Sequence, residues 1–231
     1  MLLFYLFLVK AFKQLIAKSE LSQLQAVNNK SKKTDNYGWL IATGVYVVVT
    51  LIYFREALPG FETNIIGPSE DNMKYLWSIW YGWQAITTPE LSLTFTTKMF
   101  YPEGVSLLYN DWSFYNLLLS IPLRQVFTPV GVYNLLIMSS FPLAGLGTFF
   151  LVRHLTNHTL AAMAAGLIFA LSPSHLTHAL HHMNISSIQF LPFFLLFFIK
   201  TITSSSRKHL LLATLFFLLL TICDWTWMIF A

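Results

Sequence analysis

Two adjacent carboxylates and a run of tryptophans follow the first long apolar segment, in "IIGPSEDNMKYLWSIWYGWQ" (residues 65–84). A carboxylate can accept the proton of an attacking hydroxyl or hold a divalent metal ion, so Glu70 and Asp71 are candidates for such chemistry. The same residues also suit an ordinary helix start, because Ser69 can cap it and acidic side chains favour the positive end of the helix dipole. These residues alone leave both interpretations open.

Histidines form a second candidate for chemistry. Six of the seven lie between residues 154 and 182, and they include "HLTNH" (154–158) and "HALHH" (178–182). These patterns match two of the three histidine boxes of membrane di-iron desaturases, and imidazole is a good ligand for iron. However, the apolar segment 159–171 separates the two boxes, and only His209 remains for a third. A di-iron centre is therefore the less favoured alternative, and a polar helix end at a membrane interface is the simpler one.

The composition indicates a membrane protein. The chain has 231 residues, of which 55% are hydrophobic and 10% charged, and its mean hydropathy is +0.59. Soluble domains carry about a quarter charged residues. The net charge is only +4, and basic residues gather at 30–33 and 200–208 beside apolar segments. This position beside apolar segments indicates that the basic clusters set the membrane topology and do not form a nucleic-acid-binding surface. The single cysteine, Cys223, excludes an intrachain disulfide within this sequence.

The hydropathy pattern divides the chain into a polar N-terminal part and an apolar body. Residues 1–36 are interpreted as an interfacial amphipathic helix and a polar linker. Residues 37–231 are predicted to be an all-α, polytopic transmembrane helical bundle. Helices are expected at 37–54, 72–92, 131–152, 159–171, 185–200 and from about 209. The second of these carries Trp77, Trp80 and Trp83 on one face, as expected of an interfacial helix in the first outer loop.

Basic residues predict which polar segments share a side of the membrane. The lysines at 30–33 place the start of the first span on the cytoplasmic side and Asp71 outside. If Arg153 and the 200–208 loop are also cytoplasmic, residues 172–184 and Asp224 lie outside with Asp71. This arrangement requires the short, proline-containing segment 114–127 not to cross the membrane. We expect that 114–127 does not cross, because it is too short to span the membrane. If it did cross, the histidine stretch would lie on the other side of the membrane.

The order of several motifs resembles a known family. They are "EDNMKYLWSIWYGWQAI", then "MFYPEGVSLLYNDWSFYN", then a long stretch that includes "SPSHLTHALHHMN". An acidic motif after the first span, a Trp-rich helix, a Tyr-Pro-x-Gly loop and a later Ser-Pro segment with His and Asn resemble the GT-C class of integral-membrane glycosyltransferases. The similarity is to the group related to dolichyl-phosphate-mannose protein mannosyltransferases, and it covers about residues 38–200.

The resemblance implies transfer of a sugar from a polyprenyl-phosphate donor to an acceptor on the outer face of the cytoplasmic (plasma) membrane. The family's essential acid matches Asp71, with Glu70 standing where the family often has Gly, and its His-x-Asn segment matches His182-Met183-Asn184. The implied catalytic residues are Asp71 and Glu70, and the implied substrate-binding residues are Asp111, His178, His181, His182 and Asn184. A divalent ion, Mg or Mn, is an implied cofactor, with Asp71 as its ligand.

The partners expected from the resemblance are the polyprenyl-phosphate donor and membrane lipids, with no nucleic acid and an unidentified acceptor. Residues 37–231 correspond to the N-terminal part of a GT-C domain, so a truncated or inactive chain is a further hypothesis. A transporter or flippase of a lipid-linked sugar is the main alternative to the enzyme. The enzyme hypothesis requires the acidic pair and the histidine-rich turn to meet in an outward-facing pocket.

Overall fold

The computed structural model describes residues 37–68, 71–204 and 206–230, and these form helices with one short hairpin. The predicted N-terminal segment 1–36 lies outside the described residues, as do Ser69 and Glu70. The elements are α3 Gly38–Tyr53, α4 Asp71–Thr87, β1 Phe95–Thr96, β2 Val105–Ser106, α5 Phe114–Leu123, α6 Pro129–Thr156, α7 Thr159–Ala170, α8 Pro173–His181, α9 Met183–Ser186, α10 Leu191–Ser204, α11 Arg207–Cys223 and α12 Trp227–Phe230. The prediction of an all-α fold is confirmed for this part of the chain.

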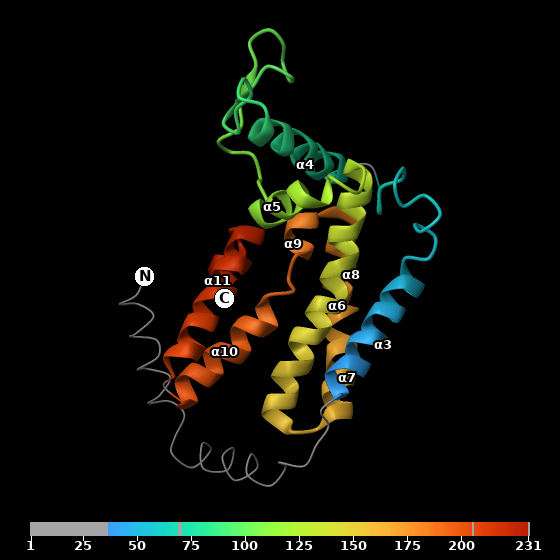
Figure 1. Cartoon of the computed structure of the whole chain (residues 1–231), viewed down its shortest axis with the longest axis vertical. Helices are drawn as coiled ribbons and strands as arrows, with labels where there is room; N and C mark the ends of the chain where they lie inside the picture. The colour runs from blue at the N-terminus through green and yellow to red at the C-terminus, as the bar shows by residue number, and fades with distance from the viewer. Residues whose placement is uncertain (1–36, 69–70, 205, 231) are drawn as a thin grey trace.

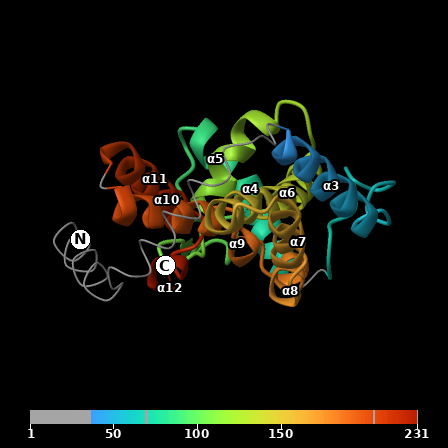
Figure 2. The ribbon, with the colours of Figure 1, turned by 90° about the horizontal axis from the view of Figure 1, so that it is seen from below.

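Helix α6 is the centre of a bundle whose long helices run along the longest axis of the molecule (Figure 1). It packs against α3, α7 and α10, and α10 in turn packs against α11. Helices α4 and α5 lie across one end of this bundle, and the β1–β2 hairpin protrudes beyond them (Figure 1). Seen along the bundle in Figure 2, α10 and α11 lie on one side of α6, and α3 and α7 on the other.

Among the residues that the structure describes, two helical stretches are long and apolar enough to cross a membrane. They are Pro129–Thr156, with 28 residues, and Thr159–His181, with 23 residues, which comprises α7 and α8. At 1.5 Å per residue these are about 42 Å and about 35 Å long, against a hydrocarbon core of about 30 Å. The helices α3, α5 and α10 are apolar but shorter.

Several element boundaries differ from the sequence-based expectation, for local reasons. Helix α6 is longer than 131–152 because Thr128 caps its start and Asn157 ends it in the left-handed conformation. Helix α4 stops at Thr87, before Pro89, and not at residue 92. The polar stretch 172–184 forms helix α8, capped by the Ser172 side chain. Helix α10 starts at Leu191 and not at 185, because the short α9 precedes it.

The segment between α3 and α4 is fixed to the bundle by a buried asparagine of α6. The amide nitrogen of Asn134 donates to the backbone oxygens of Phe61 and Asn64, both at 2.8 Å. Its amide oxygen accepts from the backbone N–H of Ile66 at 2.9 Å. Asn134 is fully buried, so each of these bonds replaces one that water would otherwise make. This network determines where the chain enters α4.

Gly67 occupies the last turn before α4, and only glycine suits this position. Its φ is +87°, in the left-handed region, and an added Cβ would lie 2.2 Å from the backbone oxygen of Leu180. A left-handed residue with a side chain costs about 1–2 kcal/mol even without a clash. The backbone of residue 67 therefore packs directly on the end of α8.

Replacing Gly67 by alanine should destabilise the protein by more than about 2 kcal/mol, because strain and overlap act together. The measurement is thermal or denaturant unfolding of the purified protein in detergent. Gly44→Ala is the matched control, since Gly44 lies in α3 with nothing within 4 Å of an added Cβ. Equal stability of the two variants would contradict the packing described for Gly67.

Candidate functional site

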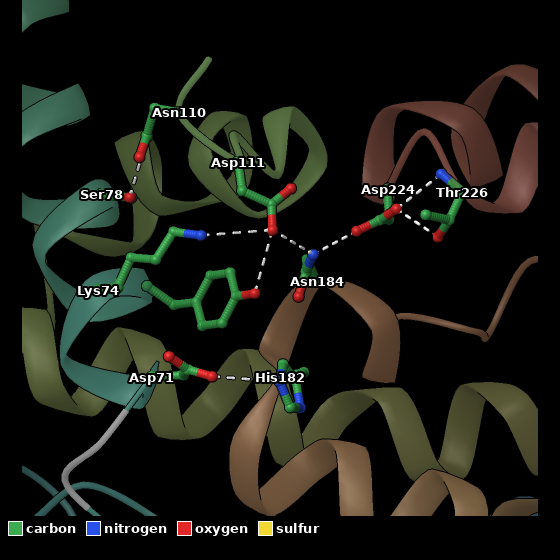
Figure 3. Close-up of polar contacts among 10 residues, drawn as sticks. Asp71, Lys74, Ser78, Asn110, Asp111, His182, Asn184, Asp224 and Thr226 are labelled. Atoms are coloured by element: carbon green, nitrogen blue, oxygen red, sulfur yellow. Dashed lines mark hydrogen bonds and ion pairs between the residues drawn. The ribbon is translucent and has the colours of Figure 1, made fainter.

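Four segments far apart in sequence bring polar side chains together at the end of the bundle crossed by α4 and α5. These are the first turn of α4, the loop before α5, the α8–α9 corner and the residues after α11 (Figure 3). We call this group the polar site. It consists of Asp71, Lys74, Tyr75, Asp111, His182, Asn184 and Asp224.

Asp71 and His182 are in direct contact, so the carboxylate and the histidine-rich turn meet, as the enzyme hypothesis requires. The Nε2 atom of His182 lies 3.2 Å from Oδ2 of Asp71 (Figure 3). The His182 side chain is 38% exposed and the Asp71 side chain is 61% exposed, so a ligand can reach both. With the proton on Nε2, the imidazole donates to one carboxylate oxygen and leaves the other for a ligand.

Asp111 is the centre of a second group of contacts. Its Oδ2 atom accepts from Asn184 Nδ2 at 2.9 Å and from the Tyr75 hydroxyl at 3.2 Å, and the Lys74 ammonium lies 3.6 Å away. Burial raises the pKa of Tyr75, and the nearby carboxylate of Asp111 raises it further. Tyr75 is therefore a neutral phenol that donates to Asp111 at physiological pH.

Asn184 joins this group to the end of α11. Its amide nitrogen donates to Asp224 as well as to Asp111, so both amide protons face carboxylates (Figure 3). Asp224 also accepts from the backbone N–H of Thr226 at 2.7 Å. Asp224 is 3% exposed and Asn184 2% exposed, so these bonds lie in the interior. The sequence analysis placed Asp224 on the same side of the membrane as residues 172–184, and the structure brings it into contact with Asn184.

Asn72 sets the position of Asp71 relative to His182. Its amide nitrogen lies 2.7 Å from the backbone oxygen of Pro68 and 2.6 Å from that of Leu180. Its amide oxygen accepts from the Tyr133 hydroxyl of α6 at 2.7 Å. Asn72 is fully buried, and it connects the start of α4 to the end of α8 and to the central helix.

The other histidines occupy different surroundings. The His178 and His181 rings lie 5.7 and 6.3 Å from that of His182, so they border the polar site. His175 is a core residue, because it stacks on Phe141 and its ring nitrogens contact Ser140 and the backbone oxygen of Ala170. His154 lies near the far end of α6, where the charges of Lys200 and His209 reach it. The two histidine boxes thus lie at opposite ends of the bundle and form no common cluster.

The outward-facing pocket expected around Asp71 and His182 stays a prediction. A small cavity beside the polar site, with room for about one water molecule, is lined by Tyr75, Ser78, Ile79, Trp112, Ser113, Asn116, Leu117 and Met183. The contact between Asp71 and His182 lies at the open surface. In the described part of the chain no three His, Cys, Asp or Glu side chains are grouped to hold a metal ion. Asp71 as a metal ligand therefore stays a prediction, and Glu70 lies outside the described residues.

Sequence reasoning missed three residues of this arrangement: Asn72, Lys74 and Tyr75. Lys74 follows Asp71 by three positions, a spacing that puts both on one helical face, so the pattern contained a signal for it. Asn72 and Tyr75 carry no such signal, because their roles depend on distant backbone and carboxylate groups. Asp111 and Asn184, both predicted to bind substrate, lie next to one another.

Searches against protein-family models, curated proteins and solved structures find no match to this chain.

Asn72→Ala should separate Asp71 from His182 as well as destabilise the fold. It leaves Tyr133 and the Leu180 backbone oxygen without their described partner, at about 1–3 kcal/mol for each buried group. Denaturant unfolding of the purified protein measures the loss of stability. Asn64→Ala is the control, because the Asn64 side chain is exposed and the Asn134 contact uses only its backbone oxygen. An Asn72→Ala protein as stable as the control would contradict this account.

Proposed function

We propose that this chain is a multi-pass protein of the cytoplasmic membrane and a GT-C-type glycosyltransferase. It transfers a sugar from a polyprenyl-phosphate donor to an acceptor on the outer face. The observation that carries the proposal is the contact of Asp71 with His182 beside Lys74 and Asp111. It places a candidate base and candidate phosphate ligands next to one another at one end of helices long enough to span a bilayer.

Asp71 acts as the general base. The acceptor hydroxyl oxygen attacks C1 of the donor sugar while its proton passes to the free oxygen of Asp71. The bond between C1 and the phosphate oxygen breaks as the new glycosidic bond forms, and the phosphate leaves on its polyprenyl carrier. His182 holds the carboxylate by donating to its other oxygen, at 3.2 Å.

Lys74 supplies positive charge to the leaving phosphate. The Lys74 side chain is 44% exposed, and its ammonium lies 3.6 Å from its described charged partner, Asp111, so it can reach a phosphate without leaving the site. His178 and His181 border the same space and can donate to phosphate oxygens. Asp111, whose side chain is 27% exposed, then accepts from a sugar hydroxyl, and the buried Asn184 amide holds its carboxylate in place.

The apolar surface next to the site suits an isoprenoid carrier. Helix α5 follows Asp111 directly, and its Phe114 and Leu118 are 46% and 54% exposed. On the bundle itself, α3 and α11 expose residues such as Ile41, Val48 and Leu211. Apolar surface of this extent favours contact with lipid, and a donor held in the bilayer could present its phosphate to Lys74 from there.

An Asp71→Asn variant should lose at least about 100-fold in sugar transfer, because amides cannot accept the proton, while donor binding is largely kept. The assay follows radiolabelled sugar from a polyprenyl-phosphate donor into membrane acceptors, with and without a chelator to test the predicted Mg or Mn dependence. Glu103→Gln, an exposed acid of the hairpin, is the control. Movement of the donor across the bilayer that survives Asp71→Asn, with no transfer by the wild type, would favour the flippase hypothesis instead.

Replacing Lys74 by glutamine should raise the KM for the donor by about tenfold or more, since a charge-assisted bond to phosphate is lost. Lys74→Arg keeps the charge and should restore most of the affinity. Lys98→Gln serves as the matched control, because Lys98 lies over the Trp80 ring, away from the site. A donor KM unchanged by Lys74→Gln would remove Lys74 from the phosphate site.

A further inference from the structure

Basic side chains gather at the end of the bundle opposite the polar site. The α6–α7 turn carries Arg153, His154 and His158, and the α10–α11 turn carries Lys200, Arg207, Lys208 and His209. These two turns lie at the same end of the molecule (Figure 1). We call this surface the basic end.

The basic end has no acidic counterpart among the described residues. The carboxylates that the structure describes lie in the segment 56–111 or at Asp224, all towards the polar site. The ion pairs formed in the described ranges involve Asp71, Asp111 and Glu56, and none involves a residue of the basic end. Converging cations without carboxylates repel one another, and an external anion would relieve this repulsion.

The distance along α6 between the two ends of the bundle indicates where that anion comes from. Arg153 follows Pro129 by 24 residues in α6, which corresponds to about 36 Å along the helix. A bilayer's hydrocarbon core is about 30 Å thick, so the basic end and the polar site lie at opposite headgroup layers.

Exposed leucines stand directly beside the cations. Leu155, Leu160 and Leu211 are 39%, 70% and 70% exposed. The Lys200 ammonium lies 5.3 Å from the centre of the Phe197 ring. Cations at the border of an apolar belt match the phosphodiester of a lipid whose acyl chains cover the leucines.

We infer that the basic end binds the phosphodiester headgroups of anionic phospholipids, between the α6–α7 and α10–α11 turns. Lys200 and Arg207 supply charge, and His154 and His209 donate hydrogen bonds to phosphate oxygens. This lipid site is separate from the donor site proposed above and does not depend on catalysis. It would hold the bundle at a fixed depth and keep the polar site at the opposite headgroup layer.

The test is a titration of the purified full chain with short-chain phosphatidylglycerol, phosphatidylcholine or inorganic phosphate, read by native mass spectrometry. We expect phosphatidylglycerol to bind more tightly than phosphatidylcholine. Lys200→Gln/Arg207→Gln should weaken this binding by about fivefold for each cation removed. Arg55→Gln/Lys98→Gln, which removes the same residue types from the other end, should leave it unchanged. Lys200→Arg should keep full binding, which separates a charge effect from misfolding.

Equal binding of the two lipids would overturn the inference. Unchanged binding by Lys200→Gln/Arg207→Gln, or an equal loss in the Arg55→Gln/Lys98→Gln control, would also overturn it. Competition by inorganic phosphate at concentrations matching the lipid would indicate a site for soluble phosphate and not for a membrane lipid. None of these results bears on sugar transfer, so the glycosyltransferase proposal is tested separately.

Discussion

The polar site depends on one buried amide, that of Asn72. Its nitrogen bonds to the Leu180 backbone oxygen at the end of α8, and its oxygen accepts from Tyr133 of α6. Gly67 allows the two backbones to approach closely, and Asn134 fixes the chain that leads to them. Because the amide is buried, water cannot replace its hydrogen bonds, and breaking them is costly. The candidate base and its histidine therefore meet through groups that do no chemistry themselves.

The site joins two kinds of surroundings. Asp71 and His182 are half-exposed, whereas Asp111, Asn184 and Asp224 form a mostly buried chain of hydrogen bonds. The exposed pair is free to exchange protons and admit a ligand. The buried chain connects the loop before α5 to the end of α11, and so joins the segment between α3 and α6 to the last long helix described. A glycosyltransferase would use the exposed pair for proton transfer and the buried chain to hold Asp111 in position.

The structure brings Asp71 and His182 into contact. The sequence predicted from apolar lengths and basic residues that the two lie on the same side of the membrane, and from the family resemblance that they meet at one site. It also predicted that 114–127 does not run the length of the bundle, since α5 lies across one end (Figure 1). It could not predict Asn72 or Tyr75, whose partners are far away in the chain. The two-residue strands β1 and β2 are too short to give an alternating pattern. The histidines were interpreted as a polar helix end without bounds, and the structure places them in and just after α8, whose start Ser172 caps.

The central claim is that Asp71 and His182 act as one catalytic unit. A double-mutant cycle tests it, with kcat/KM for sugar transfer measured for Asp71→Asn, His182→Gln and the combined variant. If His182 acts through Asp71, the combined variant will be no slower than Asp71→Asn alone. Independent losses that add in the combined variant, or wild-type protein that transfers no sugar from any polyprenyl-phosphate donor, would contradict the claim.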